Sequence, residues 1–516
     1  MSGTRGDTYW GLVEWAASEH PHRIVLRDDF GRSLTAVGLR DAATGVAAAL
    51  FARGVTPGTV VSWQLPTTLE TMAVMAALAR LGAVQNPIVP IWRESEVRFV
   101  TTQLRTELII VPGVWRSFDH LALSRSLAAE RAMATVVVDH QTAPTAGSLR
   151  LPAGDAHALP DPPSSGDDAR WIYYSSGTTA APKGVRHTDR SVMAGSAGVV
   201  GMVGASSNDV NPIAFPISHI GGAAMLAASL VTGMQLVLFD AFDAATTPFA
   251  IAKHRPTLLG TATPFFVAFM AAQQRHGAEP LFPDLRACVA GGAPITAELG
   301  RQVRETLSVP GIANAWGLTE FPVATSPVPD ADADVLDHTV GPPVPGVHVR
   351  AVGDGDREVA RGEEGELRLQ GPQCFLGYVD AALNADAFDA GGWFCTGDRG
   401  RIDSNGNVVV TGRIKDAIIR NAETISALEI EGVLATHPAV ADVAVIGVPD
   451  RRTGERVCAV VVTQPGAEVE LSELSKHCRA YRLSRHKFPE RLEVVDVLPR
   501  NLTGKVLKAE LRAKFG

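Results

Sequence analysis

Short apolar runs and helical patterns alternate through the first 160 residues of the chain. Residues 39–53 and 69–80 place apolar side chains at the spacing of helices with one buried face. Residues 59–63 and 108–111 are short runs rich in β-branched side chains, each next to a Gly or Pro, which is typical of buried strands. Strands that alternate with helices predict parallel α/β layers.

The same alternation continues in the middle of the chain. Residues 171–174 are aromatic and β-branched and predict a buried strand. Thr188 or Asp189 is suited to cap a helix that runs to about residue 203. Further strands are expected at residues 235–239, 257–259 and 287–290.

From residue 347 onward, short strands are separated by Gly/Asp and Asn/Gly turns, which are typical of hairpins and predict a β-rich subdomain. After residue 413 the pattern changes again, to helix, strand and helix at residues 428–436, 440–447 and 471–481. We therefore predict an α/β protein with a large N-terminal domain, residues 1–413, built of layered αβ subdomains plus the β-rich subdomain. A small α+β C-terminal domain, residues 414–516, follows it.

Residues 213–239 contain no charged side chain and are long enough to span a bilayer. Pro216, His219 and several glycines interrupt the segment, however, and Ala and Ser are frequent. A buried helix followed by a strand at residues 235–239 accounts for this composition better than a membrane span. We expect no integral membrane segment.

The composition is that of an ordinary soluble enzyme, with 46% hydrophobic and 20% charged residues. A net charge of −8 argues against nucleic acid as a partner. Residues 476–516 nevertheless carry 11 Lys/Arg against 4 Asp/Glu, which suits either an anionic ligand or a solvated basic face. The five cysteines are scattered and form no Cys-x-x-Cys pair, so a reducing, cytoplasmic location is expected.

A hydroxyl-rich loop follows the strand at residues 171–174. It offers small side chains, free backbone N–H groups and one cation, the chemistry that holds a polyphosphate. The same composition also suits a surface turn, and Pro182 departs from the Walker pattern. The candidate phosphate-binding residues of this loop are Ser175, Ser176, Gly177, Thr178, Thr179 and Lys183.

Five further motifs carry chemistry, although each alone also suits a turn, a surface charge or, for His219, a core histidine. Small residues at Gly291, Gly292 and Ala293 leave backbone uncovered for a flat ring or phosphate. A stacking aromatic and a carboxylate lie close together in Trp316-Gly317-Leu318-Thr319-Glu320. The other three are His219 beside Gly221 and Gly222, the Thr396-Gly397-Asp398 turn with Gly412-Arg413-Ile414-Lys415-Asp416, and Lys505 after Gly504.

In this order the motifs resemble those of the adenylate-forming superfamily, which includes acyl-CoA synthetases, luciferases and peptide-synthetase adenylation domains. The similarity extends from about residue 8 to residue 514, and residues 90–100 favour the acyl-CoA synthetase branch. The resemblance implies two steps. A carboxylate attacks the α-phosphate of ATP to give an acyl-adenylate and pyrophosphate, and the thiol of coenzyme A then displaces AMP.

The resemblance also implies roles for individual residues. The loop from Ser175 to Lys183 would hold the β,γ-phosphates, Thr319 the α-phosphate and Glu320 a Mg²⁺ ion. Adenine would lie among Gly291, Gly292, Ala293, Trp316 and Gly317, and the ribose at Asp398 and Arg413. Lys505 would be the main electrostatic catalyst of the first step, with His219 a further catalytic candidate. Asp416 would be the hinge of a mobile C-terminal domain.

Two positions depart from the family pattern, because Ala180 and Ala422 stand where glycine is usual. Ala422 would lie near the coenzyme A tunnel, so its methyl group would lower the efficiency of thioester formation if it narrowed that tunnel. The acyl pocket is expected at Gly221, Gly222 and Ala223. The small side chains there, together with those of Ala224 and Gly317, predict a roomy apolar cavity and a medium-sized or cyclic carboxylic acid as substrate.

The sequence is also compatible with two alternative functions. One is an acid–AMP ligase that delivers the acyl group to the thiol of a carrier protein. The other is a non-catalytic nucleotide-binding relative, which the presence of Glu320, Asp398 and Lys505 disfavours. The sequence leaves a homodimer open.

Overall fold

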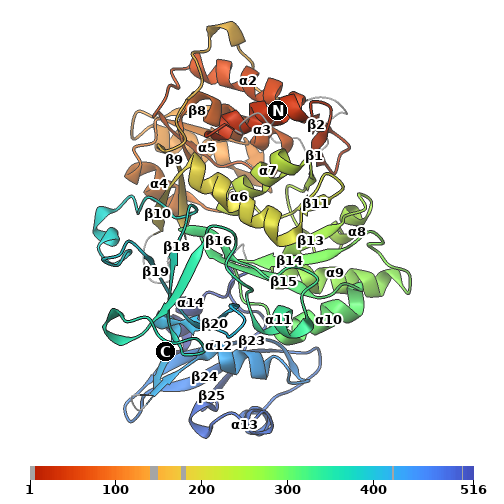
Figure 1. Ribbon diagram of the computed structural model, residues 1–516, viewed down its shortest axis with the longest axis vertical. Helices are drawn as coiled ribbons and strands as arrows, with labels where there is room; N and C mark the ends of the chain where they lie inside the picture. Colours follow the sequence, from red (N-terminus) through yellow and green to blue (C-terminus); the bar gives the residue numbers. More distant parts are fainter. Residues whose placement is uncertain (1–5, 140–148, 176–181, 421–422, 502–503) are drawn as a thin grey trace.

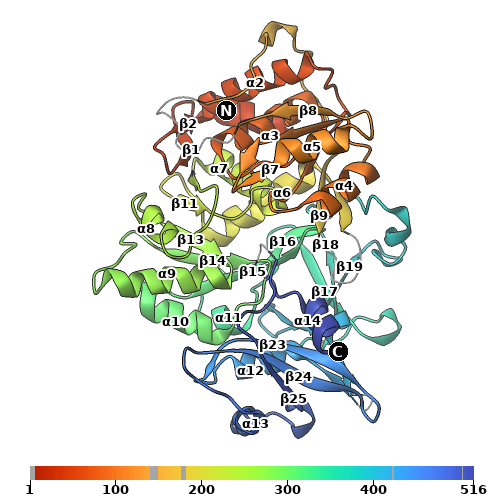
Figure 2. The same cartoon turned by 180° about the vertical axis from the view of Figure 1, so that it is seen from behind.

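The structure is a computed structural model that describes residues 6–139, 149–175, 182–420, 423–501 and 504–516. Several sheets and their helices follow one another along the long axis of the molecule (Figure 1). The N-terminal layers lie at one end and the sheet that follows Arg413 lies at the other, as the view from behind also shows (Figure 2). This arrangement confirms the predicted α/β class, with a large N-terminal part and a small C-terminal part.

A six-stranded sheet forms the first layer. Its inner strands are parallel, and an antiparallel hairpin, β9–β10, closes one edge. In spatial order the strands are β10 (Lys183–Thr188), β9 (Ala169–Ser175), β4 (Val84–Pro87), β3 (Val60–Trp63), β5 (Leu108–Val111) and β8 (Ala134–Val137). Helices α4 (Glu94–Gln103) and α5 (His120–Ala128) contribute to a separate apolar cluster beside this sheet.

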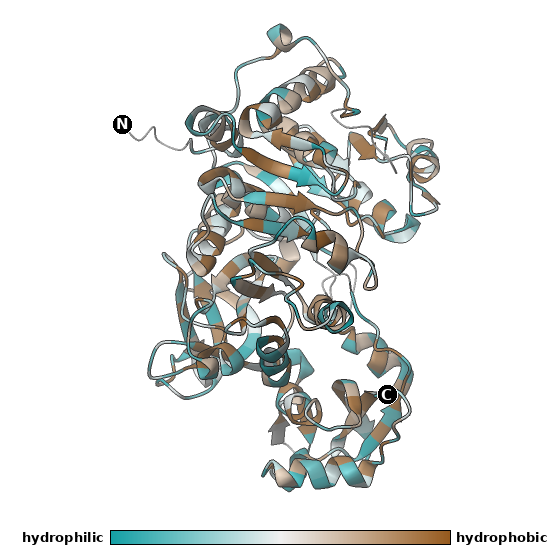
Figure 3. Cartoon of the chain, turned by 90° about the vertical axis from the view of Figure 1, so that its right-hand side faces the viewer, coloured by the Kyte–Doolittle hydropathy of each residue, from teal (hydrophilic) through white to brown (hydrophobic). Residues whose placement is uncertain are grey.

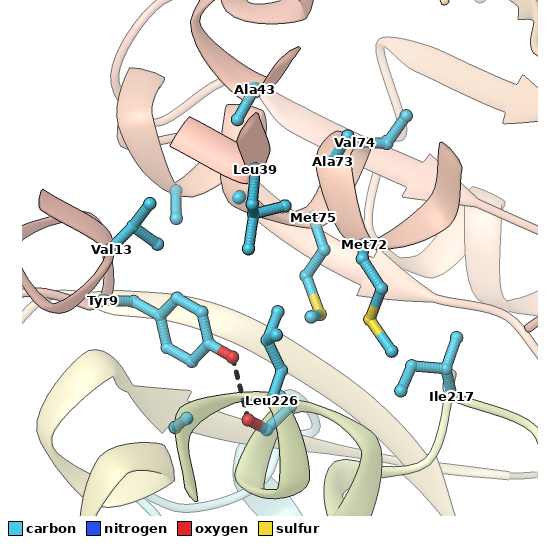
Figure 4. Packing of buried hydrophobic residues seen from close by; sticks show 14 of the residues in the cluster. Tyr9, Val13, Leu39, Ala43, Met72, Ala73, Val74, Met75, Ile217 and Leu226 are labelled. Carbon is cyan, nitrogen blue, oxygen red and sulfur yellow. Dashed lines mark hydrogen bonds between the residues drawn. The ribbon is translucent and has the colours of Figure 1, made fainter. Parts of the chain in front are cut away.

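The largest hydrophobic core lies where five helices pack together, among them the helices that hold Tyr9, Leu39, Met72 and Leu226 (Figure 4). These helices are α1 (Tyr9–Glu19), α2 (Ala36–Phe51), α3 (Leu69–Leu81), α6 (Asp189–Val203) and α7 (Ile220–Thr232). A second sheet adjoins them, in the order β11 (Val210–Ile213), β12 (Gln235–Leu238), β1 (Ile24–Asp28) and β2 (Ser33–Thr35).

The uncharged segment at residues 213–239 is confirmed as a buried helix, α7, followed by a strand, β12. In the described part of the chain, no helix combines the length and the apolar character needed to cross a membrane.

A third, mostly parallel sheet lies in the middle of the molecule. Its strands are β13 (Leu258–Thr261), β14 (Ala287–Gly291), β15 (Ile312–Leu318) and β16 (Phe321–Thr325), accompanied by α8 (Thr247–Ala252), α9 (Thr263–His276), α10 (Ala297–Leu307) and α11 (Ala333–His338). The predicted β-rich subdomain is an antiparallel sheet of β17 (His348–Val352), β18 (Gly365–Gln370), β19 (Phe394–Ile402) and β20 (Val408–Arg413). A small hairpin, β6 (Val114–Trp115) and β7 (Phe118–Asp119), stands apart.

The residues after Arg413 form a sheet with apolar clusters of their own. Hydrophobic residues, in brown, gather in the strands here as in the larger sheets (Figure 3). The strands are β22 (Glu423–Ile425), β21 (Ile418–Arg420), β24 (Gly454–Thr463), β23 (Val440–Asp450) and β25 (Arg491–Val494), and the helices are α12 (Ala427–Leu434), α13 (Leu471–Ala480) and α14 (Lys508–Phe515). The predicted strand at residues 440–447 is longer than expected, because it pairs along its whole length with β24, an element absent from the sequence prediction.

Helix α6 lies close to the strand β16 through two glycines. The helix begins after Thr188, whose side chain accepts a hydrogen bond from the backbone N–H of Ser191, so the predicted cap is confirmed. Gly195 and Gly198 face Pro322 and Val323, and a Cβ atom at Gly198 would lie 2.9 Å from Cγ1 of Val323. Val323 has a φ of 51°, a left-handed conformation that is strained for a β-branched residue.

We expect Gly198→Ala to lower the free energy of unfolding by about 1–3 kcal/mol, because the added methyl group overpacks the contact with Val323. Gly201→Ala is the matched control in the same helix, since a Cβ there meets nothing within 4 Å. It should stabilise the protein by up to about 1 kcal/mol through helix propensity. Thermal unfolding compares the two variants. Equal stability would contradict the proposed tight contact.

Candidate active site

A cleft of about 850 Å³ lies between the central sheet, the β-rich sheet and the sheet that follows Arg413. It is formed by segments that are far apart in the sequence. The predicted site residues that line it are Gly292, Ala293, Trp316, Gly317, Asp398, Arg413, Asp416 and Lys505. The structure thus brings the candidate adenine, ribose, hinge and catalytic residues to one place.

A buried carboxylate, Asp398, lies at the centre of this arrangement. The indole Nε1–H of Trp316 donates a hydrogen bond of 2.9 Å to its Oδ2, and Nε of Arg413 lies 2.8 Å from its Oδ1. Asp398 and Arg413 are also directly paired on the neighbouring strands β19 and β20. The carboxylate is therefore held by a hydrogen bond on Oδ2 and by an ion pair on Oδ1, which accepts no hydrogen bond from the described residues.

Asn314 lies two residues before Trp316 on β15 and also lines the cleft. Its Oδ1 is buried and has no hydrogen-bond partner within the described part of the protein. An unpaired buried acceptor is costly unless a ligand supplies a donor. The sequence motif included Asn314, but nothing in it distinguished this side chain from its neighbours.

Lys505 enters the cleft on a tight turn. Gly504 has a φ of 80°, and a Cβ atom there would lie 3.1 Å both from Cβ of Ala262 and from Cδ of Pro264. The turn is thus docked against the large domain at the start of α9. Burial, reinforced by repulsion from Arg413, lowers the pKa of Lys505 to about 8, although Asp398 and Asp416 act in the opposite direction.

Arg500 holds the turn that carries Lys505. Its Nη2 donates hydrogen bonds of 2.8 and 2.7 Å to the two carboxylate oxygens of Asp442, and its Nη1 donates to the carbonyl oxygen of Gly504. Asn501 closes the turn from the other side, because its Oδ1 accepts a 2.9 Å hydrogen bond from the Lys505 N–H. Arg500 belonged to the sequence motif, but its partner Asp442 could not be predicted from it.

The segment Thr319–Glu320 forms the turn between β15 and β16. Its backbone is held by His187, whose Nε2 donates a 2.8 Å hydrogen bond to the Thr319 carbonyl oxygen. Burial lowers the pKa of His187 to about 4, so the ring is neutral. The Glu320 Oε1 accepts a 2.8 Å hydrogen bond from the hydroxyl of Tyr378, a residue that sequence reasoning missed.

The two ends of the candidate phosphate loop lie opposite each other on neighbouring strands. Ser175 ends β9 and Lys183 begins β10, and the two are directly paired across the hairpin. The other loop residues singled out in the sequence, Ser176, Gly177, Thr178, Thr179 and Ala180, lie outside the described residues. The same is true of Ala422.

The described residues contain no group of three or more His, Cys, Asp or Glu side chains that could hold a metal ion. Mg²⁺ does not need such a group, because it is commonly bound by one or two carboxylates together with substrate phosphates. Glu320 supplies such a carboxylate, and its Oε1 accepts the hydrogen bond from Tyr378. Glu320 therefore fits a magnesium ion that is completed by a nucleotide.

The hinge candidate Asp416 is tied to the C-terminal helix. Nη2 of Arg512 on α14 donates a 3.0 Å hydrogen bond to its Oδ1. Burial raises the pKa of Asp416, but Lys508 and Arg512 outweigh it and hold the pKa below its usual value. Asp416 is thus charged and paired with Arg512 in this structure.

The acyl-pocket candidates lie outside the residues that line the cleft. His219 begins α7, and its buried Nε2 has no partner in the described ranges; burial lowers its pKa to about 4. A side chain at Gly222 would collide with the Ile217 carbonyl, and Ala223 is fully buried in the helical core. Close packing therefore explains Gly222 and Ala223, which do not by themselves indicate a roomy cavity. Gly317 behaves in the same way, with the Val323 nitrogen 2.6 Å from where its Cβ would be. Gly221 differs, because a Cβ atom there would meet only Phe215, at 3.9 Å.

Comparison with known proteins agrees with this geometry. The chain matches the family model of the AMP-binding enzymes over residues 13–379 and that of the AMP-binding enzyme C-terminal domain over residues 429–505. It is 30% identical to the medium-chain fatty-acid–CoA ligase of Escherichia coli strain K12, with 98% of this chain and 89% of the relative covered. It is 31% identical to the salicyl-AMP ligase / salicyl-S-ArCP synthetase of Mycobacterium tuberculosis, covering 99% and 92%.

The fold also matches a solved structure over nearly its whole length. The crystal structure of ATP-bound MatB from Rhodopseudomonas palustris superposes with a TM-score of 0.89 at 26% identity, covering 99% of both chains. The apo crystal structure of MatB superposes less closely, with a TM-score of 0.79. The chain belongs to the AMP-binding enzyme family and, with it, to the adenylate-forming superfamily.

Proposed function

We propose that the chain is an AMP-forming ligase that joins a medium-sized or cyclic carboxylic acid to coenzyme A through an acyl-adenylate. The observation that carries this proposal is the meeting of Lys505 with the Trp316–Asp398–Arg413 cluster in one cleft. A lysine from one domain then faces the nucleotide-binding residues of the other. The substrates named for the two relatives above, a medium-chain fatty acid and salicylate, support the choice of acid.

ATP would bind with its base and sugar at the Asp398 end of the cleft. A carboxylate is well suited to accept the two hydroxyls of a ribose. Trp316 holds Oδ2 of Asp398, and its Oδ1 has no hydrogen-bond partner among the described residues. The ring of Trp316 offers a stacking face. The unpaired Oδ1 of Asn314 can accept from the amino group of adenine.

Catalysis of the first step would depend mainly on positively charged groups that are already in position around the reacting phosphates. Lys505 would contact both the acyl carboxylate and the α-phosphate, while Lys183 and Ser175 would hold the terminal phosphates. Bound Mg²⁺ at Glu320 would offset charge on the phosphates as pyrophosphate leaves. Loss of one preorganised charge of this kind typically costs on the order of 10²–10³ in rate, or about 3–4 kcal/mol.

The second step would need the small domain to move. We infer that the boundary lies between residues 413 and 414 and that the rotation occurs at Asp416, which the pair with Arg512 holds in the present arrangement. Rotation would withdraw Lys505 and bring another face of the small domain to coenzyme A. Ala422 would then lie near the path of the thiol.

The test of the proposed function is an AMP-release assay over acids of varied size, with and without coenzyme A. We expect release that depends on coenzyme A and is fastest with medium-chain or ring acids, and a loss of about 10²–10³ in Lys505→Ala. Best turnover with acetate or propionate would contradict the proposed substrate class. Pyrophosphate exchange without consumption of coenzyme A would favour the carrier-protein alternative, and restored thioester formation in Ala422→Gly would locate the cause.

Trp316→Phe should keep a stacking ring but remove the donor to Asp398. A hydrogen bond to a charged group is worth about 1.5–3 kcal/mol, so we expect the KM for ATP to rise at least tenfold, with little change in the KM for the acid. Trp393→Phe is the control, because Trp393 packs under Arg350 and does not line the cleft. An unchanged KM for ATP would contradict the role of the indole N–H.

The pKa of Lys505 near 8 predicts an alkaline limit to the first step. The ammonium is the active form, so kcat/KM for ATP–pyrophosphate exchange should fall as the pH rises through about 8. Lys505→Arg remains charged over this range, and its profile should lack the fall even if its rate is lower. If the wild type and Lys505→Arg showed the same fall in kcat/KM with pH, the alkaline limit would belong to another group.

A further inference from the structure

The residues 376–379 run along the outer edge of β10, the strand that begins with Lys183. The N–H of Leu376 donates to the Arg186 carbonyl at 2.8 Å, the N–H of Arg186 donates to the Gly377 carbonyl at 3.1 Å, and the N–H of Val379 donates to the Gly184 carbonyl at 2.8 Å. Val185 and Tyr378 pair as an antiparallel bridge. The backbone of Tyr378 is thus held against the strand that leaves the phosphate loop.

The side chain of Tyr378 contacts two charged groups of the site at once. Its hydroxyl donates the 2.8 Å hydrogen bond to Oε1 of Glu320, and Nζ of Lys183 lies 5.2 Å from its ring centroid, within range of a cation–π interaction. Tyr378 and Glu320 are both buried, each only 8% exposed.

The backbone of Tyr378 is locked by a second residue. The Oδ1 of Asn384 accepts a 2.7 Å hydrogen bond from the Tyr378 N–H, and its Nδ2 donates to the Tyr378 carbonyl at 3.3 Å. The ring of Phe375 packs edge-on against the phenol ring at 4.9 Å. With the backbone clamped and the ring packed, little freedom is left to the phenol.

We propose that Tyr378 is a positioning residue that fixes the carboxylate of Glu320 for the metal–nucleotide and supports the ammonium of Lys183 for its terminal phosphates. This inference rests on the proposed function. The hydroxyl uses one oxygen of Glu320 and leaves Oε2 for the cation, while the ring places the lysine on the same support. The metal then contacts the Glu320 carboxylate and the phosphates contact the Lys183 ammonium, and the rigid side chain of Tyr378 sets the distance between these two groups.

Tyr378→Phe separates the two contacts, because it removes the hydroxyl but keeps the ring under Lys183. We expect binding of Mn²⁺–ATP, measured by electron paramagnetic resonance, to weaken about tenfold. The Mg²⁺ concentration that half-saturates pyrophosphate exchange should rise by a similar factor. Binding of ATP in the presence of EDTA, measured by calorimetry, should not change.

Three further variants complete the experiment. Tyr378→Leu loses both contacts and should also weaken metal-free ATP binding. Asn384→Ala loosens the Tyr378 backbone without touching the phenol, and it should raise the half-saturating Mg²⁺ concentration by a smaller factor, about two- to fivefold. Trp393→Phe changes an aromatic side chain outside the residues that line the cleft, so it is the control and should behave as the wild type.

The outcomes distinguish this inference from the proposed function. Wild-type affinity for Mn²⁺–ATP in both Tyr378→Phe and Asn384→Ala would overturn the positioning role, even in an enzyme that exchanges pyrophosphate. Equal weakening of metal-free and metal-bound ATP in Tyr378→Phe would also overturn it, since that result indicates a general structural role. Absence of any exchange by the wild-type enzyme, over the whole panel of acids, would instead contradict the proposed function.

Discussion

The docking of Gly504 against Ala262 and Pro264 is the contact on which the assembled cleft depends. It brings a lysine from the last residues of the chain to a carboxylate that two other strands have already fixed. The contact involves backbone and small apolar groups and has little area. Repulsion between Lys505 and Arg413 opposes this arrangement, so a polyanion bound between them would strengthen it.

The large domain supplies a rigid surface for this contact. Helix α6, with glycines where other helices carry side chains, lets β16 approach closely and keeps Val323 in a conformation it would not adopt alone. The same strand follows directly on Thr319 and Glu320. Close backbone packing below the site is therefore what fixes the two residues above it, while most of the small residues near α7 serve the core instead.

Much of the fold could be predicted from the sequence because its signals are local. A cap such as Thr188 depends on a few consecutive residues, and the strand at residues 108–111 was delimited by its own Pro and Gly. The motifs likewise identified several of the residues that line the cleft, among them Trp316, Asp398 and Lys505. These predictions succeed because each depends on short-range chemistry.

The connections between motifs could not be predicted in this way. The Tyr378 hydroxyl reaches Glu320 across 58 residues, Arg500 reaches Asp442 across another 58, and the indole of Trp316 reaches Asp398 across 82. No periodicity or spacing records such pairs. The prediction of a roomy acyl cavity from small side chains failed for a related reason. A glycine leaves open space only where no neighbouring backbone occupies it, and at Gly222 and Gly317 neighbouring backbone occupies that space.

The hydrogen bonds between residues 376–379 and β10 have a consequence for the behaviour of the protein in solution. The strand β10 is the last in its sheet, and its free edge would offer N–H and carbonyl groups to any extended chain. The segment that carries Tyr378 occupies those groups. The segment that carries Tyr378 thus also covers this edge against strand addition from a second molecule, so loss of the segment would expose the protein to aggregation.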